Sequence, residues 1–167
     1  YEFVERDPKT RLPKMAPPYL PEENPVGVYR REIEIPEEWE DREIFLTIDG
    51  AKSGVYVYIN GKEVGYSEDS KTSAEFRISN HVKPGKNSLV LKIFRWSTGS
   101  YLEAQDFWRI SGIERDVFLW SQPKTSLRDF RVISTLDDSY QNGVFKLETT
   151  VRNFNDEVAY ADVTYEL

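Results

Sequence analysis

The stretch 95–116 gathers the residues of this sequence that are best suited to contact a sugar. Aromatic, carboxylate, amide and guanidinium side chains follow one another there without the period of a strand or of a helix. A sugar offers apolar C–H faces on which rings can stack, and hydroxyls that Asp, Gln and Arg can hydrogen-bond. Leaving the large rings of this stretch in water would be costly, which favours a binding loop over a disordered one. The rings are those of Trp96, Tyr101, Phe107 and Trp108.

Asp106 is the strongest single candidate in this loop. A carboxylate can accept a hydrogen bond from a sugar hydroxyl and can bind a hard cation through oxygen. From spacing alone, the plainer interpretation is a loop aspartate that caps a turn or pairs with Arg109. A catalytic pair of Glu103 and Asp106 is a weak hypothesis, because nearby acids are expected by chance in a chain with 29 Asp and Glu residues. We expect Glu103 to pair with Arg95 or Arg109 instead.

Composition narrows the classes of partner and of chemistry. The chain has 167 residues and a net charge of -7, which argues against nucleic acid or an anionic membrane surface as a partner. No apolar run approaches the length needed to cross a bilayer. Because the sequence begins at Tyr1 and not at Met, we interpret it as a fragment of a longer protein.

The chain contains no cysteine and a single histidine, His81. Disulfides, zinc–thiolate sites and cysteine nucleophiles are therefore excluded, and a serine triad or a histidine-based metal site is hard to build. We interpret His81 as a surface turn residue. The absence of cysteine is compatible with a reducing compartment without requiring one, so cytoplasmic and periplasmic locations both stay open.

The elements that carry the loop are predicted to be β-strands. Residues 1–26 form a Pro-rich arm, since six of the nine prolines lie there. Residues 27–122 show about seven or eight short alternating strands with turn signals at the spacing of a sandwich, and no sustained helical period. Asn60-Gly61 between alternating runs predicts a tight hairpin. The stretch 36–39 predicts one helical turn.

Several further side chains are assigned to structure rather than to a site. The tyrosines of the hairpin are interpreted as part of a sheet face, and Trp39 and Trp120 as core or edge packing. Arg109 and Arg115 are expected to clamp loop carboxylates and carbonyls, because guanidinium groups make bidentate bonds that fix geometry. The hairpin tyrosines are Tyr56, Tyr58 and Tyr66.

Residues 123–167 are predicted to begin a second domain. After Pro123 the pattern gives three further strands, 127–134, 143–152 and 159–166, and then stops. Three strands are too few for an immunoglobulin-like sandwich, which needs about seven. The expected fold is therefore an all-β, antiparallel jelly-roll-type β-sandwich followed by the first strands of a truncated immunoglobulin-like β-sandwich.

Three motifs carry a family resemblance, and together they lie along most of the chain: 24–29 (Asn-Pro-Val-Gly-Val-Tyr), 64–70 (Val-Gly-Tyr-Ser-Glu-Asp-Ser) and 95–117. They resemble the large bacterial β-galactosidases of glycoside hydrolase family 2. The resemblance implies that 27–122 is the jelly-roll sugar-binding domain, preceded by the arm 1–26, and that 123–167 is part of the immunoglobulin-like domain that follows it.

The resemblance also implies a function. The parent would be a retaining hydrolase of terminal β-D-galactosides such as lactose, with its catalytic glutamates on a TIM barrel outside this sequence, so the fragment should be inactive alone. Asp106 would reach that barrel and contact galactosyl hydroxyls and a bound sodium ion. Tyr101 and Trp108 would contact substrate, or else anchor the loop. Magnesium and a homo-oligomeric state are implied for the parent.

Two alternatives with a ligand or an activity stay open, besides a third that is purely structural. One is a stand-alone carbohydrate-binding module, and the other is the corresponding domain of another family 2 glycosidase, a β-glucuronidase or a β-mannosidase. A purely structural domain that packs on the barrel is also compatible with the pattern.

Overall fold

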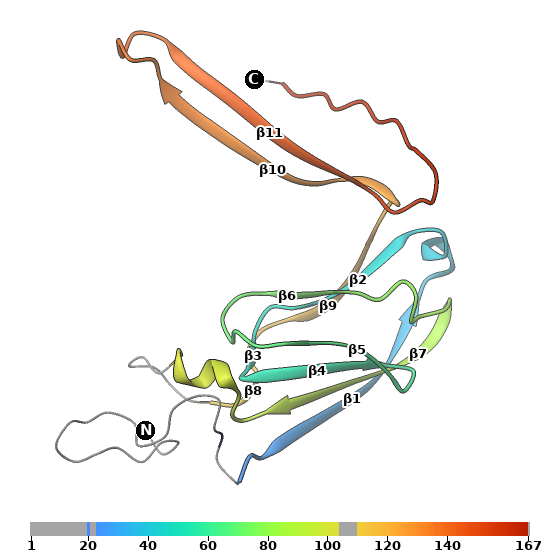
Figure 1. The fold of residues 1–167 in the computed structure, drawn as a ribbon. Helices are drawn as coiled ribbons and strands as arrows, with labels where there is room; N and C mark the ends of the chain where they lie inside the picture. Colours follow the sequence, from blue (N-terminus) through green and yellow to red (C-terminus); the bar gives the residue numbers. More distant parts are fainter. Residues whose placement is uncertain (1–19, 21–22, 104–109, 167) are drawn as a thin grey trace, which may run out of the picture. The chain divides into compact units, whose positions relative to one another are not determined.

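The computed structural model describes residues 20, 23–103 and 110–166 of the chain. Within these residues the regular structure is antiparallel β-sheet, with two short 3-10 helices and no α-helix (Figure 1). Two compact units are present: the described residues up to Glu40 with Ile44–Trp120, and Asp41–Glu43 with the described residues after Trp120. None of the helices among the described residues has the length and apolar character needed to cross a membrane.

The first unit contains a four-stranded sheet in the order β1-β7-β4-β5. β7 pairs with β1 along its whole length, from Val26 opposite Phe94 to Ile35 opposite Gly85, and with β4 on its other side. The strands of this sheet are β1 (Val26–Ile35), β4 (Gly54–Ile59), β5 (Lys62–Ser67) and β7 (Gly85–Phe94).

A three-stranded sheet in the order β6-β2-β9 supplies the second layer of the same unit, and a two-stranded ladder joins β3 to β8. One face of each large sheet is apolar, and the two faces enclose a core that includes Leu46, Val57 and Ile93. The all-β antiparallel sandwich of jelly-roll type is thereby confirmed. The strands are β2 (Glu43–Ile48), β3 (Ala51–Lys52), β6 (Ala74–Arg77), β8 (Gly112–Ile113) and β9 (Val117–Gln122).

Local predictions in this unit are confirmed. Asn60 and Gly61 both have positive φ, 50° and 80°, as a tight hairpin between β4 and β5 requires. The 3-10 helix η1 (Glu37–Trp39) is the expected helical turn.

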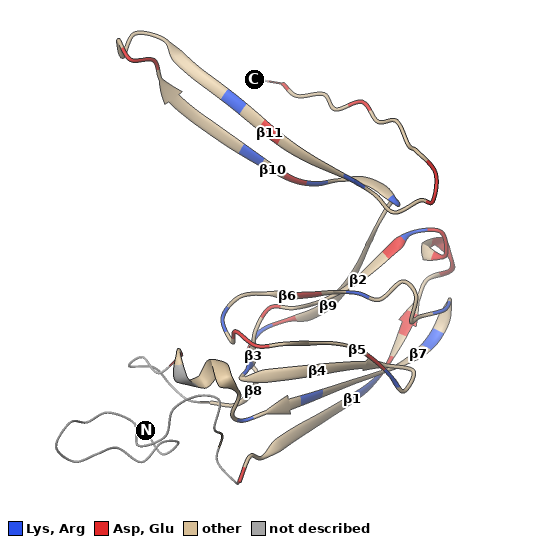
Figure 2. Ribbon diagram, in the orientation of Figure 1, with Lys and Arg blue, Asp and Glu red and all other residues tan. Residues whose placement is uncertain are grey.

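Acidic and basic residues are interspersed along the strands and connections (Figure 2).

The second unit contains the hairpin β10 (Thr125–Leu136) and β11 (Gly143–Asn153), followed by an extended segment. The predicted strand at 159–166 is wrong: no strand is formed between residues 154 and 166. The physical reason is that alternation alone makes no ladder. Two strands without a second layer bury too little to hold a third, and Tyr160 is 96% exposed. The immunoglobulin-like assignment of 123–167 stays a prediction.

Candidate functional site

The loop 95–116 is described at both ends but not in its middle. Asp106, Trp108, Phe107 and Arg109 lie outside the described residues. Tyr101 ends the 3-10 helix η2 (Thr98–Tyr101), which begins the loop. The sequence suggested a loop that is irregular throughout. The structure differs, because η2 and β8 lie within the loop. The structure shows how the loop is held, and these anchors are the part of the site that can be built from contacts.

The first anchor joins the loop to the segment before β1. The side-chain amide of Asn24 donates to the carbonyl oxygen of Trp96 and accepts from its backbone N–H, both at 2.9 Å. Beside it, the N–H of Arg95 donates to the carbonyl of Pro25 at 2.9 Å. Trp96 itself is 7% exposed. Asn24 thus completes the pairing of the chain just where β7 ends, a role that sequence reasoning missed because its partner lies 72 positions away.

The second anchor is the carboxylate of Glu68, on the connection between β5 and β6. It accepts hydrogen bonds from the Thr98 hydroxyl at 2.8 Å and from the Gly99 N–H at 2.5 Å, at the start of η2. It also accepts from the Tyr66 hydroxyl at 2.6 Å. A charged acceptor makes such bonds shorter and stronger than those between neutral groups. Glu68 therefore fixes the first turn of the loop to the sheet.

Glu103 provides the third anchor, and its partner in the described residues is Ser70. Its two carboxylate oxygens accept from the N–H and the hydroxyl of Ser70, at 2.8 and 2.6 Å. Arg109 lies outside the described residues, so the predicted pairing of Glu103 with Arg95 or Arg109 stays a prediction. Ser70 is only 1% exposed and holds two donors, so it needs a nearby acceptor. A Glu68–Asp69–Ser70 turn thus holds two separate points of the loop.

The two anchoring carboxylates approach each other at Gly99. A Cβ atom added there would lie 3.1 Å from Oε2 of Glu68 and 3.7 Å from Oε1 of Glu103. Glycine permits this close approach because it has no side chain to displace either carboxylate. Both acids are engaged by donors of the chain itself and act as structural acceptors.

The far end of the loop is held by Arg115, as predicted. Its guanidinium donates to the carbonyl oxygens of Lys71, at 3.1 Å, and of Asp49, at 3.4 Å. The ammonium group of Lys71 in turn pairs with the carboxylate of Glu114. Both ends of the loop are therefore fixed to the segment that contains Glu68, Ser70 and Lys71.

The side chains assigned to structure keep that role. Trp120 stacks on Phe45 with ring centroids 4.6 Å apart and donates from Nε1 to the Thr47 hydroxyl. The rings of Tyr56 and Tyr66 lie 4.4 Å apart on the sheet. His81 lies in a turn, as predicted, but is half-buried instead of exposed. Among the described residues, no three His, Asp or Glu side chains gather at a point that could hold a metal ion.

Protonation of Glu68 should loosen the loop. Partial burial raises the pKa of this carboxyl. The hydrogen bonds that it accepts, led by those from Tyr66 and Thr98, lower the pKa by more than burial raises it, so the pKa lies below its usual range. A lowered pKa in the folded state means stability that is fully present above the unfolded value of about 4.3 and is lost as the pH falls through the folded pKa.

We therefore expect the melting temperature of the chain to fall more steeply between pH 5 and the acid limit of its folding, roughly pH 3, than that of the Glu68→Gln variant. Thermal melts over this range measure the difference. Glu63→Gln is the control, because Glu63 lies on β5, the strand that leads to Glu68. Parallel pH profiles for the wild type and Glu68→Gln would contradict the assignment of Glu68 as an acid-sensitive anchor.

The family match and the named relatives of this chain point to the same family of proteins. The family described as "Glycosyl hydrolases family 2, sugar binding domain" matches residues 10–123. The β-galactosidase of Priestia megaterium is 40% identical over 168 residues, covering 100% of this chain and 16% of that protein. The β-galactosidase of Lactococcus lactis subsp. lactis is 45% identical over 143 residues, covering 85% of this chain and 14% of that protein. The chain thus spans less than a fifth of the length of these relatives.

A similar fold occurs in solved structures. A β-glucuronidase from Ruminococcus gnavus superposes with a TM-score of 0.65 at 25% identity, covering 75% of this chain and 24% of that one.

Proposed function

Because the chain belongs to the sugar binding domains of the glycosyl hydrolases family 2, we propose that it is the non-catalytic carbohydrate-contact portion of a β-galactosidase. One observation carries the choice of galactosides: the relatives that match at 39 to 45% identity bear the name β-galactosidase, whereas the β-glucuronidase structures match at 23 to 26%. The parent would hydrolyse terminal β-D-galactosides such as lactose with retention.

In the proposed parent, this chain contacts the sugar and another domain carries the catalytic residues. Retaining hydrolysis needs two carboxyl groups about 5 Å apart across the scissile bond. Two acids that anchor the loop, Glu68 and Glu103, are occupied by protein donors. The resemblance to family 2 places both catalytic glutamates on a TIM-barrel domain of the parent, so we expect the 167-residue chain to be inactive toward a chromogenic galactoside.

In this proposal the anchored loop presents Asp106 to the barrel. Its carboxylate would accept hydrogen bonds from galactosyl hydroxyls and contribute an oxygen ligand to a sodium ion, whose charge would help to hold the substrate hydroxyls in place. Trp108 and Tyr101 would line the same pocket. Magnesium and a homo-oligomeric state belong to the proposed parent, not to this loop.

Asp106→Asn in the full-length enzyme tests the assignment. The amide keeps the shape of the side chain but removes its charge, so we expect a large fall in kcat/KM for o-nitrophenyl galactoside together with a weakened dependence on sodium. Steady-state kinetics in sodium and in potassium buffers measure both. Unchanged kcat/KM with unchanged sodium dependence would refute the role of Asp106.

A stand-alone carbohydrate-binding module is the second candidate, favoured by the family description as a sugar binding domain. Isothermal calorimetry of the 167-residue chain with galactose separates the two. Millimolar or tighter binding supports the module, whereas no binding supports a loop that needs the barrel to complete its site.

A further inference from the structure

We infer that Asn142 is a site of spontaneous deamidation, at which the backbone nitrogen of Gly143 attacks the side-chain amide and releases ammonia. The site lies in the turn between β10 and β11 of the second unit, and not in the loop that carries Asp106. The reaction there is independent of the proposed function, because it needs neither a sugar nor another domain.

Two asparagines of this chain are followed by glycine, Asn60 and Asn142. Asparagine is among the thermolabile residues of proteins, because the nitrogen of the next residue can attack its side-chain carbonyl carbon and close a five-membered ring. A glycine at that next position favours ring closure, since it has no side chain in the way and its backbone rotates freely. The surroundings of each asparagine then decide whether the ring can form.

The backbone nitrogen of Gly143 is left out of the ladder between β10 and β11. The N–H of Asp137 donates to the carbonyl oxygen of Asn142 at 2.9 Å, so these two residues form a hydrogen-bonded pair. Such pairs alternate with non-hydrogen-bonded pairs along an antiparallel ladder, and the next pair is Leu136 opposite Gly143. The N–H of Gly143 therefore points away from β10, and no third strand of the described residues pairs with this hairpin.

The turn also leaves room for the ring to close. Asn142 and Gly143 are both exposed, and a Cβ atom added at Gly143 would meet nothing within 4 Å. In the described part of the chain, one hydrogen bond holds the amide of Asn142, from Nδ2 to Oδ2 of Asp137 at 2.6 Å. That bond lies at the surface, where water competes for both groups. The electrophilic carbon and the attacking nitrogen are thus both accessible.

Asn60 is the counterexample within the same chain. Its side-chain oxygen accepts from the N–H of Ser88 at 2.9 Å, and its nitrogen donates to the carbonyl of His81 at 3.0 Å and to Oδ1 of Asn87 at 2.8 Å. Three bonds must break before this amide can turn toward Gly61. Because each bond is worth about a factor of five, the two additional bonds predict a reaction roughly 25-fold slower than at the turn of the second unit.

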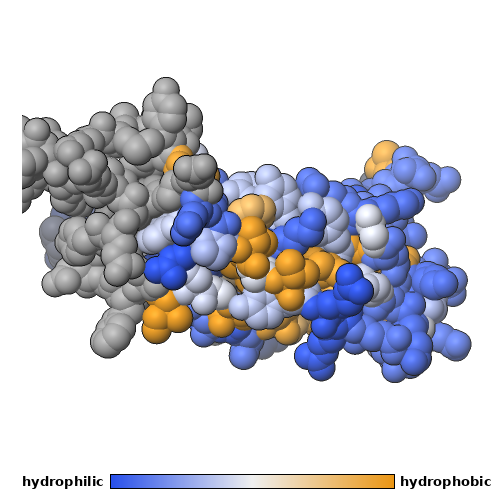
Figure 3. All heavy atoms as spheres, turned by 90° about the horizontal axis from the view of Figure 1, so that it is seen from below, coloured by the Kyte–Doolittle hydropathy of each residue, from blue (hydrophilic) through white to orange (hydrophobic). Residues whose placement is uncertain are grey.

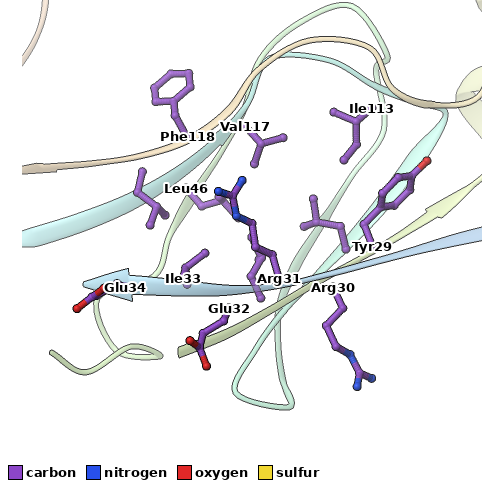
Figure 4. Close-up of a pocket in the computed structure, with 13 residues that line it drawn as sticks. Tyr29, Arg30, Arg31, Glu32, Ile33, Glu34, Leu46, Ile113, Val117 and Phe118 are labelled. Carbon is purple, nitrogen blue, oxygen red and sulfur yellow. The ribbon is translucent and has the colours of Figure 1, made fainter. Parts of the chain in front are cut away.

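The groove beside β1 in the first unit offers no comparable group. It combines apolar side chains such as Ile33 and Val117 with the charged Arg31 (Figure 4). None of the described residues that line it is an asparagine or a glutamine. Seen from below, the exposed surface shows hydrophobic residues in the middle of hydrophilic ones (Figure 3). The reactive position is therefore set by the backbone of the turn between β10 and β11, and not by a hollow or an apolar surface.

The reaction balances with water alone. The nitrogen of Gly143 gives up its proton and bonds to Cγ of Asn142, the bond from Cγ to Nδ2 breaks, and the amide nitrogen leaves with that proton as ammonia. The cyclic imide then takes up one water molecule and opens at either of its carbonyls. One opening gives aspartate and the other gives isoaspartate, whose main chain runs through the former side chain. Both products carry one more negative charge than asparagine.

The product opposes the turn in which it forms. The amide of Asn142 and, after it, the hydroxyl of Ser139 hold the pKa of the Asp137 carboxyl below its usual range by donating to it. Deamidation replaces the Nδ2 donor by a carboxylate oxygen that faces Oδ2 of Asp137, and like charges at this distance repel. Isoaspartate also lengthens the backbone beside the last pair of the ladder. We therefore expect the turn to loosen as the reaction proceeds.

Peptide mapping of the full-length protein tests the site. The protein is incubated at mildly alkaline pH, and mass spectrometry follows the exchange of amide for carboxylate at each asparagine. Asn142 should convert roughly 25-fold faster than Asn60. Gly143→Ala should slow conversion at Asn142 without disturbing the fold, because the added methyl group meets no neighbour. Equal rates at Asn60 and Asn142, no conversion at Asn142, or no effect of Gly143→Ala would each overturn the inference.

Hydrogen exchange tests the effect on the turn. Asn142→Asp imitates one product, whereas Asn142→Gln keeps an amide donor and forms the cyclic imide far less readily. The amides of 137–142 should exchange faster in Asn142→Asp and in the incubated protein than in Asn142→Gln. Equal exchange in the three proteins would refute the loosening. Neither measurement uses galactoside hydrolysis, so this inference and the proposed function fail independently.

Discussion

Glu103→Ala in the full-length parent is expected to lower kcat/KM by about 100-fold, the cost of misplacing a reacting or positioning group by roughly 1 Å. Glu103 lies three positions before Asp106 and takes both donors of the buried Ser70. Without its carboxylate, the segment that leads to Asp106 loses its tether to the sheet. Steady-state kinetics with o-nitrophenyl galactoside measure the effect.

Two comparisons separate this positioning role from general destabilisation. Glu103→Gln keeps the length of the side chain and one oxygen acceptor, so it should recover part of the lost activity. Glu114→Ala removes a surface ion pair with Lys71 at the other end of the loop, and it should cost little. The sodium dependence of kcat/KM should change with Glu103→Ala but not with Glu114→Ala. Equal kinetic losses for the two alanine variants would show that Glu103 has no special part in placing Asp106.

Ile93→Ala should give the largest loss of stability, about 2–5 kcal/mol of the free energy of unfolding. Ile93 is 2% exposed and lies on β7, which pairs with strands on both sides. Truncation leaves a cavity that neighbours fixed in two ladders cannot fill. Urea denaturation followed by tryptophan fluorescence measures the change in midpoint and slope.

Val28→Ala is the matched control for this core prediction. Val28 is also β-branched and lies on the adjacent strand, but it is 59% exposed. A surface truncation of this kind should change the free energy of unfolding by no more than about 0.5 kcal/mol. A loss below about 1 kcal/mol for Ile93→Ala would mean that this part of the sandwich is not closely packed.

Sequence alone determined the features that are written in local periods and turn chemistry. Alternation identified the strands of the first unit, and Asn60-Gly61 identified the hairpin because few residue pairs adopt two positive φ angles. The motif that ends at Val117 identified the family, because so long a run of specific residues leaves little room for chance. The same local logic failed at 159–166, where alternation was present but no strand partner was.

Only the tertiary structure decided what holds the loop. Glu103 meets Ser70, 33 positions earlier in the chain. Asn24 meets Trp96 across 72 positions, and Glu68 meets Gly99 across 31. Such pairings depend on which strands become neighbours, and no period in the sequence encodes that. Among the described residues, the edge positions of β1 and β9 are likewise a property of strand order, which exists only once the two sheets have formed.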